Sequence, residues 1–584
     1  MDFPVRYVDI LNGKMKHAIA RLTEFDSQGN SMSPAPTYKP LEIEVTDFGP
    51  IARAKLDLRP LTVFVGPSNT GKSYLATLIY ALHRFFGGYA NSPNLSPKAL
   101  TFYPLLPFHR VLSGVWMKAM SATERDTLID WVKPLLVHAR EEEFADDFRA
   151  SVPDAVAVLF RPLLRDVSDL DDYLEREIAR CFGIESLARL VRHGSRDGAR
   201  VVLKRYVAEP PRPVEPFTHE FTIRSRKSIF TASIPDATPL QIERNDGEPW
   251  YQEKLRLMDS HISLYSDLEG SSRESVASVI RDDVADVVGT CTVSPLNRVA
   301  HYLPADRAGV MHAHRAVMTS LIRQAPHGGP HRSETAPTLS GVLADFLEQL
   351  VAFGDSPREE RSAAFLEEVA GLSISLQRAC DENRFLAATL EAEILKGTVH
   401  HRQSITGYPV FSYQPQGRRE EVPLLNASSM VSELAPVVLY LRYLVYPGDV
   451  LIIEEPEAHL HPAMQRAFTR QLAAAVRAGV RVMITTHSDY VLEELANLVR
   501  MSELPETRRE GLMGADVALN PDEVGVWLFE PKKRPKGSVV KEIPLDADVG
   551  LYSAGYGDVT EALYNTSVEI DSRIGESKTG YESR

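Results

Sequence analysis

Apolar residues recur along this chain at two spacings, which predict alternating strands and helices. Residues 41–45 and 54–58 alternate between apolar and polar side chains, the pattern of half-exposed strands. Residues 61–65 form a continuous apolar run, as in a buried strand, and apolar residues then recur at helical spacing from Leu75 to Leu82. A buried strand followed by a short loop and a helix is typical of an α/β core.

Similar patterns return in the second half of the chain. A helix is expected from about Val431 to Tyr446, and further helices are expected between the later strands. The expected strands are residues 394–399, 410–413, 450–453, 480–484, 524–529 and 539–543, of which the last two form a closing hairpin.

The long stretch between these two regions has a mixed pattern. Helical spacing prevails over residues 96–199 and again over 339–380. Between them lie extended runs at 201–203 and 221–223 and a short apolar strand before Pro304. The sustained heptads of a long coiled-coil arm are missing, so we expect compact inserted domains.

Composition and charge restrict the function classes. The chain has 584 residues, of which 44% are hydrophobic and 25% charged, which is enough for two or three domains with their own cores. A formal net charge of −14 argues against a surface that coats nucleic acid, although a local basic groove remains open. The dense basic cluster at residues 532–536 is interpreted as a solvated hairpin turn, with DNA contact as the alternative.

The sequence predicts a cytoplasmic protein. Its three cysteines are too few and too widely spaced for a disulfide framework, as is usual in a reducing compartment. The N-terminus lacks the basic and apolar segments of a signal peptide. The most apolar segment, residues 434–453, is interrupted by a turn, so no membrane span is expected.

A glycine-rich loop directly after the strand at 61–65 has the pattern of a phosphate-binding P-loop. Backbone N–H groups of such a loop surround phosphates at the N-terminus of a helix. Lys72 is expected to reach the β- and γ-phosphates of ATP, and the Ser73 hydroxyl is expected to bind Mg²⁺. Tyr74 departs from the second hydroxyl residue common at that position. The predicted nucleotide-binding residues here are Gly66, Pro67, Ser68, Asn69, Thr70, Gly71, Lys72, Ser73 and Tyr74.

A second phosphate-handling pattern follows nearly four hundred residues later. Four apolar residues, 450–453, lead into Glu454 and Glu455, the pattern of a Walker B strand. Glu454 occupies the place where Asp usually holds Mg²⁺. Glu455 is the candidate general base that polarises the hydrolytic water. Since both motifs must serve one nucleotide, the chain between them is expected to leave the core and return.

Histidines after the later strands are further candidates. His487 follows the strand at 480–484 and is expected to lie beside the γ-phosphate as a catalytic residue. The pairs His459 with His461 and His312 with His314 have the spacing of metal ligands, but no third ligand follows at a clear spacing. Zinc is therefore disfavoured.

In this order the motifs resemble the SMC/RecF-like branch of ABC-type ATPases, nearest to the overcoming-lysogenisation-defect (OLD) proteins and related phage-defence ATPases. The similarity covers about residues 41–89 and 394–500, with a weaker link at 302–307. It implies an α/β fold with an ABC-type P-loop ATPase core, a split sheet, a β subdomain and large helical insertions. The motifs that carry it are residues 48–51, 66–73, 427–430, 454–462 and 485–488.

We accordingly divide the chain into seven parts. They are an N-terminal extension (1–38), a core lobe with the P-loop (39–95), a helical insertion (96–199), a β-rich segment rejoining the core (200–310), a second helical insertion (311–393), a core lobe with signature, Walker B and His487 (394–500), and a C-terminal hairpin and tail (501–584).

The resemblance also implies a way of assembling. Residues 426–433 would be the signature segment, which in this superfamily meets the γ-phosphate of the opposing subunit. ATP would then join two chains head to tail, as a homodimer or a higher oligomer, with Ser428 and Ser429 as the contacting hydroxyls. Met430 stands where glycine is common, and His461 stands where transporter-type relatives have Asp.

OLD nucleases carry an additional Toprim domain with catalytic acidic residues, and such a domain is not expected here. The late candidates are Asp546 and Asp548, but too little chain follows for a second acidic strand. A separate partner would then supply any nuclease or toxin.

The leading hypothesis is an ATPase that regulates such an effector in phage defence. A DNA repair or recombination clamp that binds DNA directly is the alternative, followed by an OLD-type nuclease and a transporter ATPase. Arg307 either completes the ATP site or is a buried salt-bridge partner.

Overall fold

The computed structural model describes the chain in separate ranges. Residues 1–40 and parts of both predicted helical insertions lie outside them. The described residues are 41–86, 171–205, 217–224, 228–233, 298–314, 339–352, 383–403, 409–445, 448–534 and 536–546, with shorter pieces at 121, 123, 130, 149–151, 241–244, 261–264, 296, 550–551 and 565–570.

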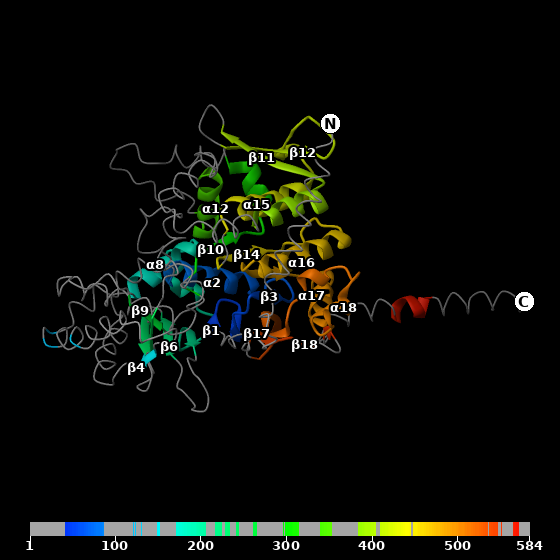
Figure 1. Ribbon diagram of the computed structural model, residues 1–584. Helices are drawn as coiled ribbons and strands as arrows, with labels where there is room; N and C mark the ends of the chain where they lie inside the picture. Colours follow the sequence, from blue (N-terminus) through cyan, green and yellow to red (C-terminus); the bar gives the residue numbers. More distant parts are fainter. Residues whose placement is uncertain are drawn as a thin grey trace, which may run out of the picture. The chain divides into compact units, whose positions relative to one another are not determined.

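A mixed sheet of 11 strands organises the described chain (Figure 1). Its order is β10-β14-β15-β3-β16-β17-β2-β1-β5-β6-β7. Strands β10, β14, β15, β3 and β16 pair in parallel, whereas β2, β1, β5, β6 and β7 pair antiparallel. The strands are β1 Glu42–Phe48, β2 Ile51–Asp57, β3 Leu61–Val65, β5 Ala199–Arg205, β6 Phe217–Ile223, β7 Ile229–Ser233, β10 Ala300–Leu303, β14 Val450–Glu454, β15 Arg481–Thr486, β16 Val524–Lys532 and β17 Gly537–Glu542.

Helices and three small sheets complete the described elements, and the predicted α/β class is confirmed. The helices are α2 Lys72–Phe86, α8 Asp171–Phe182, α12 Gly341–Ala352, α15 Ser429–Tyr443, α16 Pro462–Arg477, α17 Asp489–Ser502 and α18 Glu506–Arg509. The small sheets are β11 Gly397–Gln403, β12 Pro409–Pro415 and β13 Val422–Pro423; β4 Arg149–Ser151, β8 Gln241–Arg244 and β9 His261–Leu264; and β18 Leu545–Asp546 with β19 Gly550–Leu551.

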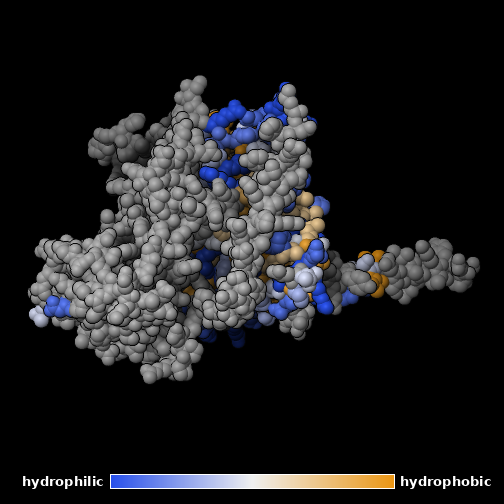
Figure 2. Space-filling view, in the orientation of Figure 1, coloured by the Kyte–Doolittle hydropathy of each residue, from blue (hydrophilic) through white to orange (hydrophobic). Residues whose placement is uncertain are grey.

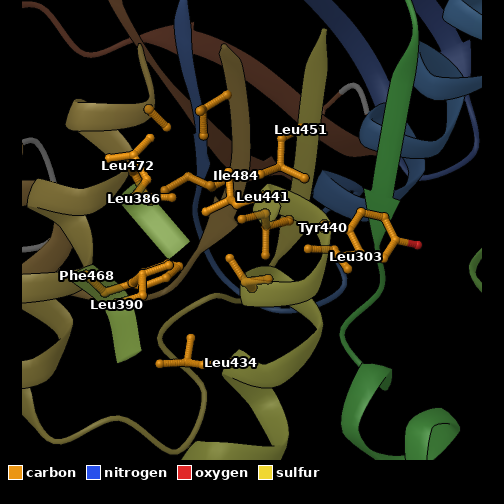
Figure 3. Close-up of a cluster of buried hydrophobic side chains, with 14 of the residues drawn as sticks. Leu303, Leu386, Leu390, Leu434, Tyr440, Leu441, Leu451, Phe468, Leu472 and Ile484 are labelled. Atoms are coloured by element: carbon orange, nitrogen blue, oxygen red, sulfur yellow. The ribbon is translucent and has the colours of Figure 1, made fainter. Parts of the chain in front are cut away.

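Successive residues of the central strands face two different hydrophobic cores. On β14, Val450 and Ile452 pack in the core that contains residues of α2 and α8. Leu451 and Ile453 pack in the core that contains residues of α15, α16 and α17. Figure 3 shows this second core, with Leu451 of β14 among side chains from helices and neighbouring strands. Burial on both faces explains why these parallel strands are continuous apolar runs.

The structure corrects the predicted start of one strand. The sequence predicts a strand from Ile394, but Glu391–Leu395 forms a π-helical turn, and β11 begins only at Gly397. Ile394 and Leu395 are buried in the core with α15. A short apolar run fits a helix end as well as a strand, so its pattern did not distinguish them.

The other strands predicted in the second half are confirmed as β12, β14, β15, β16 and β17. The predicted closing hairpin is the antiparallel pair β16 and β17, and the basic residues at 532–536 lie at its turn. Lys532 there is paired with Glu530. Of the described helices, none is both long and apolar enough to cross a bilayer.

A buried ionic network joins α2 to α8 and α12. Asp345 of α12 accepts hydrogen bonds from Tyr80 of α2 and from both terminal nitrogens of Arg180 of α8, each at 2.8 Å. Glu177 of α8 accepts from Arg84 of α2 at 2.6 Å. Burial, and then the Asp345 carboxylate, raise the pKa of Tyr80 well above its ordinary value, so its hydroxyl remains a donor. The helix after the P-loop is therefore tied to segments from the middle of the chain.

Replacing Asp345 with Ala should loosen α12. The substitution removes a buried acceptor of three hydrogen bonds, at a cost of about 3 kcal/mol. Faster amide hydrogen exchange in α8 and α12 would report that loss. Glu348→Ala on the exposed face of α12 is the matched control and should leave exchange unchanged; equal protection in the two variants would contradict the prediction.

Candidate functional site

The predicted site residues lie at one edge of the sheet because their strands are parallel. Val65 at the end of β3 pairs with Thr486 of β15, and Thr485 pairs with Glu454 at the end of β14. Leu303 at the end of β10 pairs with Ile453. The carboxyl ends of four strands are thus aligned, and open α/β sheets bind ligands at this edge.

The loop after β3 has the backbone that a P-loop requires. Gly66 has φ 140°, and a Cβ there would lie 2.7 Å from the Phe529 carbonyl oxygen. Gly71 has φ 102°, and a Cβ there would lie 2.8 Å from Ile51 Cγ1. Both positions therefore demand glycine, for conformation and for space. Helix α2 begins at Lys72, so its N-terminus opens onto the loop.

Lys72 is buried beneath this loop. Its Nζ donates to the carbonyls of Gly66 and Pro67 at 2.8 and 2.9 Å. Burial lowers the pKa of Lys72, and the charges of Glu455, Glu457 and Glu454 oppose that change. The ammonium group and the carboxylates after β14 therefore share one electrostatic environment.

The remaining loop residues differ in exposure. Thr70 is buried and donates to the Pro67 carbonyl at 2.7 Å. The Tyr74 ring lies 5.5 Å from that of Phe182, between centroids, and also packs beside Gly49. Pro67, Ser68, Asn69, Ser73 and Tyr74 are exposed.

Glu454 is a buried carboxylate with one free oxygen. Its Oε2 accepts a hydrogen bond from the Ala305 backbone at 3.1 Å. Its Oε1 is buried and has no hydrogen-bond partner among the described residues. Burial and the nearby Glu454 charge raise the pKa of Tyr302 well above its ordinary value, so Tyr302 stays a neutral phenol there. A buried oxygen without a donor fits a cation or a bound water.

Glu455 is held in an unusual backbone conformation. Its φ is 45°, which is rare for a residue other than glycine. Its N–H donates to the Thr485 carbonyl at 2.9 Å and lies 3.2 Å from the Thr485 hydroxyl. The side chain is about half exposed, and one of its oxygens lies 3.7 Å from His487 Nε2. Strain of this kind, held by neighbours, is often found at functional sites.

His487 completes this arrangement as a neutral ring. Burial, and then the charge of Lys72, lower its pKa, while Glu455 and Glu457 oppose the change. The ring therefore stays uncharged near neutral pH and can donate one hydrogen bond and accept another.

Glu457 is a residue of the site to which the sequence assigned no role. One of its oxygens accepts from the Thr486 hydroxyl at 2.7 Å and from the His487 backbone at 2.6 Å. It thus ties the turn after β14 to the turn after β15. In the sequence, only its position within the acidic motif pointed to a role for Glu457, because its hydrogen-bond partners lie 29 and 30 residues away.

Arg307 lies after β10 with its side chain fully buried. It donates to the carbonyl oxygens of Glu433, Glu454 and Glu455, and forms an ion pair of 3.1 Å with the Glu433 carboxylate. Burial lowers the pKa of Arg307 and raises that of Glu433, and each charge opposes the shift of the other. Of the two roles left open by the sequence, the structure contains the buried salt bridge, with Glu433 as the partner. The same guanidinium contacts the backbone of the acidic motif.

The predicted signature serines are exposed at the start of α15. Ser428 caps the helix by accepting from the Val431 N–H at 3.4 Å, and Ser429 is the first helical residue. Leu425, just before them, is 65% exposed. The segment therefore presents hydroxyls and an apolar side chain outward from its own chain.

The four histidines with metal-ligand spacing are separated by their contacts. His461 caps α16, and His459 lies 4.0 Å from Glu433. His312 contacts the Ser432 hydroxyl at 3.0 Å, and His314 contacts two backbone carbonyls. Among the described side chains, no group of three or more His, Cys, Asp or Glu residues is arranged to hold a metal ion. Asp546 lies on β18, and Asp548 is outside the described residues.

The residues at the sheet edge fit ATP with Mg²⁺. Gly66 and Gly71 give the loop its backbone conformation at the N-terminus of α2, where anions are favoured, and Lys72 supplies a cation. The exposed Ser73 hydroxyl and the free oxygen of Glu454 are hard oxygen donors of the type that Mg²⁺ prefers, with phosphates and water as its remaining ligands.

Comparison with protein families supports an AAA-type ATPase domain in part of the chain. Residues 305–493 match the model described as "AAA domain, putative AbiEii toxin, Type IV TA system". This segment is less than half of the chain; it contains the acidic motif and His487 but not the P-loop. No curated protein matches the chain.

Solved structures of SMC heads also show similarity. An SMC head bound to the C-terminal winged-helix domain of ScpA is 11% identical, with 87% of this chain and 98% of that chain covered and a TM-score of 0.35. An SMC head with an extended coiled coil bound to the C-terminal domain of ScpA, from Pyrococcus furiosus, is 10% identical, with 90% and 98% covered and a TM-score of 0.34. The SMC head from Thermotoga maritima is 10% identical, with 87% and 99% covered and a TM-score of 0.30.

The pH dependence of ATP hydrolysis should report His487. A protonated ring would pair with Glu455 and withdraw that carboxylate from water. Because the pKa of His487 is lowered from its ordinary value of 6.5, the acid limb of kcat/KM should have its midpoint below pH 6.5. The acid limb due to this ring should be absent in His487→Gln. A midpoint above 6.5, or an identical profile in the variant, would show that another group is responsible.

Proposed function

We propose that this chain is a cytoplasmic ATPase that binds ATP with Mg²⁺, associates head to tail with a second copy through the nucleotide, and thereby regulates a separate effector. The observation that carries the proposal is the convergence of Lys72, Glu455 and His487 at one sheet edge, with Glu455 held at φ 45°.

In this proposal each residue has a defined task. The loop from Gly66 to Ser73 holds the phosphates, and Lys72 balances their charge. Glu455 accepts a proton from the attacking water, and neutral His487 orients the terminal phosphate. Ser73 and Glu454 would hold Mg²⁺, which would neutralise phosphate charge.

The exposed signature segment supports association with a second copy. Ser428 and Ser429 lie at the N-terminus of a 15-residue helix, where anions are favoured. Within the chain, Ser428 caps its own helix, and Leu425 is left exposed beside it. Figure 2 shows hydrophilic and apolar residues side by side on the described part of one face of the molecule. An opposing nucleotide would complete this segment.

The effector and the defence setting rest on the family comparison. The description of the matching domain names a toxin of a toxin–antitoxin system. We propose that the partner is a toxin or nuclease and that the setting is anti-phage defence. Direct DNA binding by a clamp is less well supported, since Lys532 of the basic cluster is paired with Glu530.

Replacing Glu455 with Gln should separate ATP binding from hydrolysis. Loss of the general base should lower kcat about a hundredfold or more, while the intact P-loop still binds ATP. The dimer should then accumulate with ATP, as measured by size-exclusion chromatography with light scattering, and retain the effector on purification from native cells. Unchanged turnover would refute the role of Glu455.

Two variants serve as controls for that experiment. Lys72→Ala should lose ATP binding and therefore both dimer and ATP-dependent effector contact. Glu493→Gln makes the same carboxylate-to-amide change at an exposed position of α17 and should behave as the wild type. Retention of DNA, without any protein partner, by Glu455→Gln would favour the clamp.

Mixing two inactive variants tests the head-to-tail arrangement. A dimer of Ser429→Ala with Lys72→Ala has one site with an intact P-loop and an intact opposing signature, and one site with neither. The mixture should hydrolyse ATP faster than either variant alone, but at no more than half the wild-type rate per chain. Full restoration, or no gain on mixing, would contradict the arrangement.

A further inference from the structure

The guanidinium of Arg307 connects three segments that are distant in sequence. Its Nε donates to the Glu433 carbonyl at 3.0 Å, and its Nη1 donates to the Pro304 and Glu454 carbonyls at 3.2 and 2.6 Å. Its Nη2 donates to the Glu455 carbonyl at 3.3 Å and pairs with the Glu433 carboxylate. The planar guanidinium has five N–H donors and can bond to all of these acceptors at once. A lysine ammonium group, with three donors on one nitrogen, cannot.

On one side, these contacts fix the backbone that aims Glu455. The Glu455 N–H is held by Thr485, and the Glu455 carbonyl is held by Arg307. Because φ is 45° there, the residue needs support from both directions to remain in place. Ala305, two residues before Arg307, donates its backbone N–H to the Glu454 carboxylate, so the segment that carries Arg307 also holds the side chain of Glu454.

On the other side, Arg307 holds α15 one turn after its start. Glu433 lies four residues after Ser429, one helical turn away on the same face. Its side chain is buried, and both its carbonyl and its carboxylate face Arg307. A displacement of Glu433 would therefore move the exposed serines with it, since one hydrogen-bonded turn is rigid.

We propose that Arg307 is a positioning residue that couples the signature segment to the hydrolytic carboxylate, so that Ser429 and Glu455 change position together. This inference rests on the proposed ATPase function and adds a regulatory link to it. Contact of the signature with an opposing nucleotide would tighten α15 against Arg307 and so set Glu455 for hydrolysis. Hydrolysis would then depend on the paired state of the two copies.

The test variant is Arg307→Lys, which keeps the positive charge but loses the fork. We expect kcat to fall about ten- to a hundredfold, as small misplacements of catalytic groups do. The Kd of a non-hydrolysable ATP analogue should stay near the wild-type value, because Lys72 and the P-loop are untouched. Light scattering should show weaker dimerisation with that analogue.

A second readout needs no nucleotide. In Arg307→Lys, hydrogen exchange should accelerate together at the amides of Val431 and Ser432 in α15 and of Glu455 and Ala458 after β14. Arg481→Lys is the matched control, since Arg481 is also buried but donates to the Leu58 carbonyl at the opposite end of β15. It should lower the melting temperature without changing kcat or exchange at those four amides.

Glu433→Gln provides an independent variant should Arg307→Lys fail to fold. It should lower kcat in the same direction. Where Arg307→Lys does fold, combining the two substitutions should lower kcat by less than the product of their separate effects, since both break one link.

The inference is overturned if Arg307→Lys lowers only the melting temperature and keeps the wild-type kcat. Exchange that accelerates in α15 or after β14 alone would overturn it as well, and so would ATP binding lost in parallel with kcat. A wild-type chain that neither binds nor hydrolyses ATP would refute the proposed function itself. An active wild type with an equally active Arg307→Lys would refute only the coupling.

Discussion

The parallel pairing of β10, β14, β15 and β3 is the constraint on which the site depends. Parallel strands end at the same edge, so residues that follow Leu303, Glu454, Thr486 and Val65 must meet there. A change of register by one residue would turn each strand's side chains to the other core. Since the strands are buried on both faces, such a change would disturb two hydrophobic cores at once.

Charges near this edge are balanced by one another. Lys72 and Arg307 are both buried, and three glutamates at and just after the end of β14 lie near them. A buried cation without such neighbours would lose its proton or disrupt the fold. The same environment lowers the pKa of His487. The edge therefore combines fixed charges with one neutral ring.

Residues with a local signal could be predicted from sequence. The P-loop follows an apolar run and precedes helical spacing, and Glu454 and Glu455 follow another apolar run, so their positions needed only the pattern of neighbouring residues. The role of Arg307 had no such signal and stayed open, because its acceptors other than the Pro304 carbonyl lie 126, 147 and 148 residues away. Ile394 shows the opposite limit, since its apolar neighbourhood fitted both a strand and the helix end that the structure contains.

The sequence alone determined the α/β class, most of the strands and the candidate P-loop, acidic motif and histidine, because alternation, glycine and apolar runs act between neighbours in the chain. The tertiary structure decided that β15 lies between β14 and β3, that Glu457 joins two turns, and that Arg307 faces both Glu433 and Glu455. These contacts join segments that are far apart in the sequence and that pack together to bury apolar surface. The spacing of residues along the chain does not show which distant segments pack together.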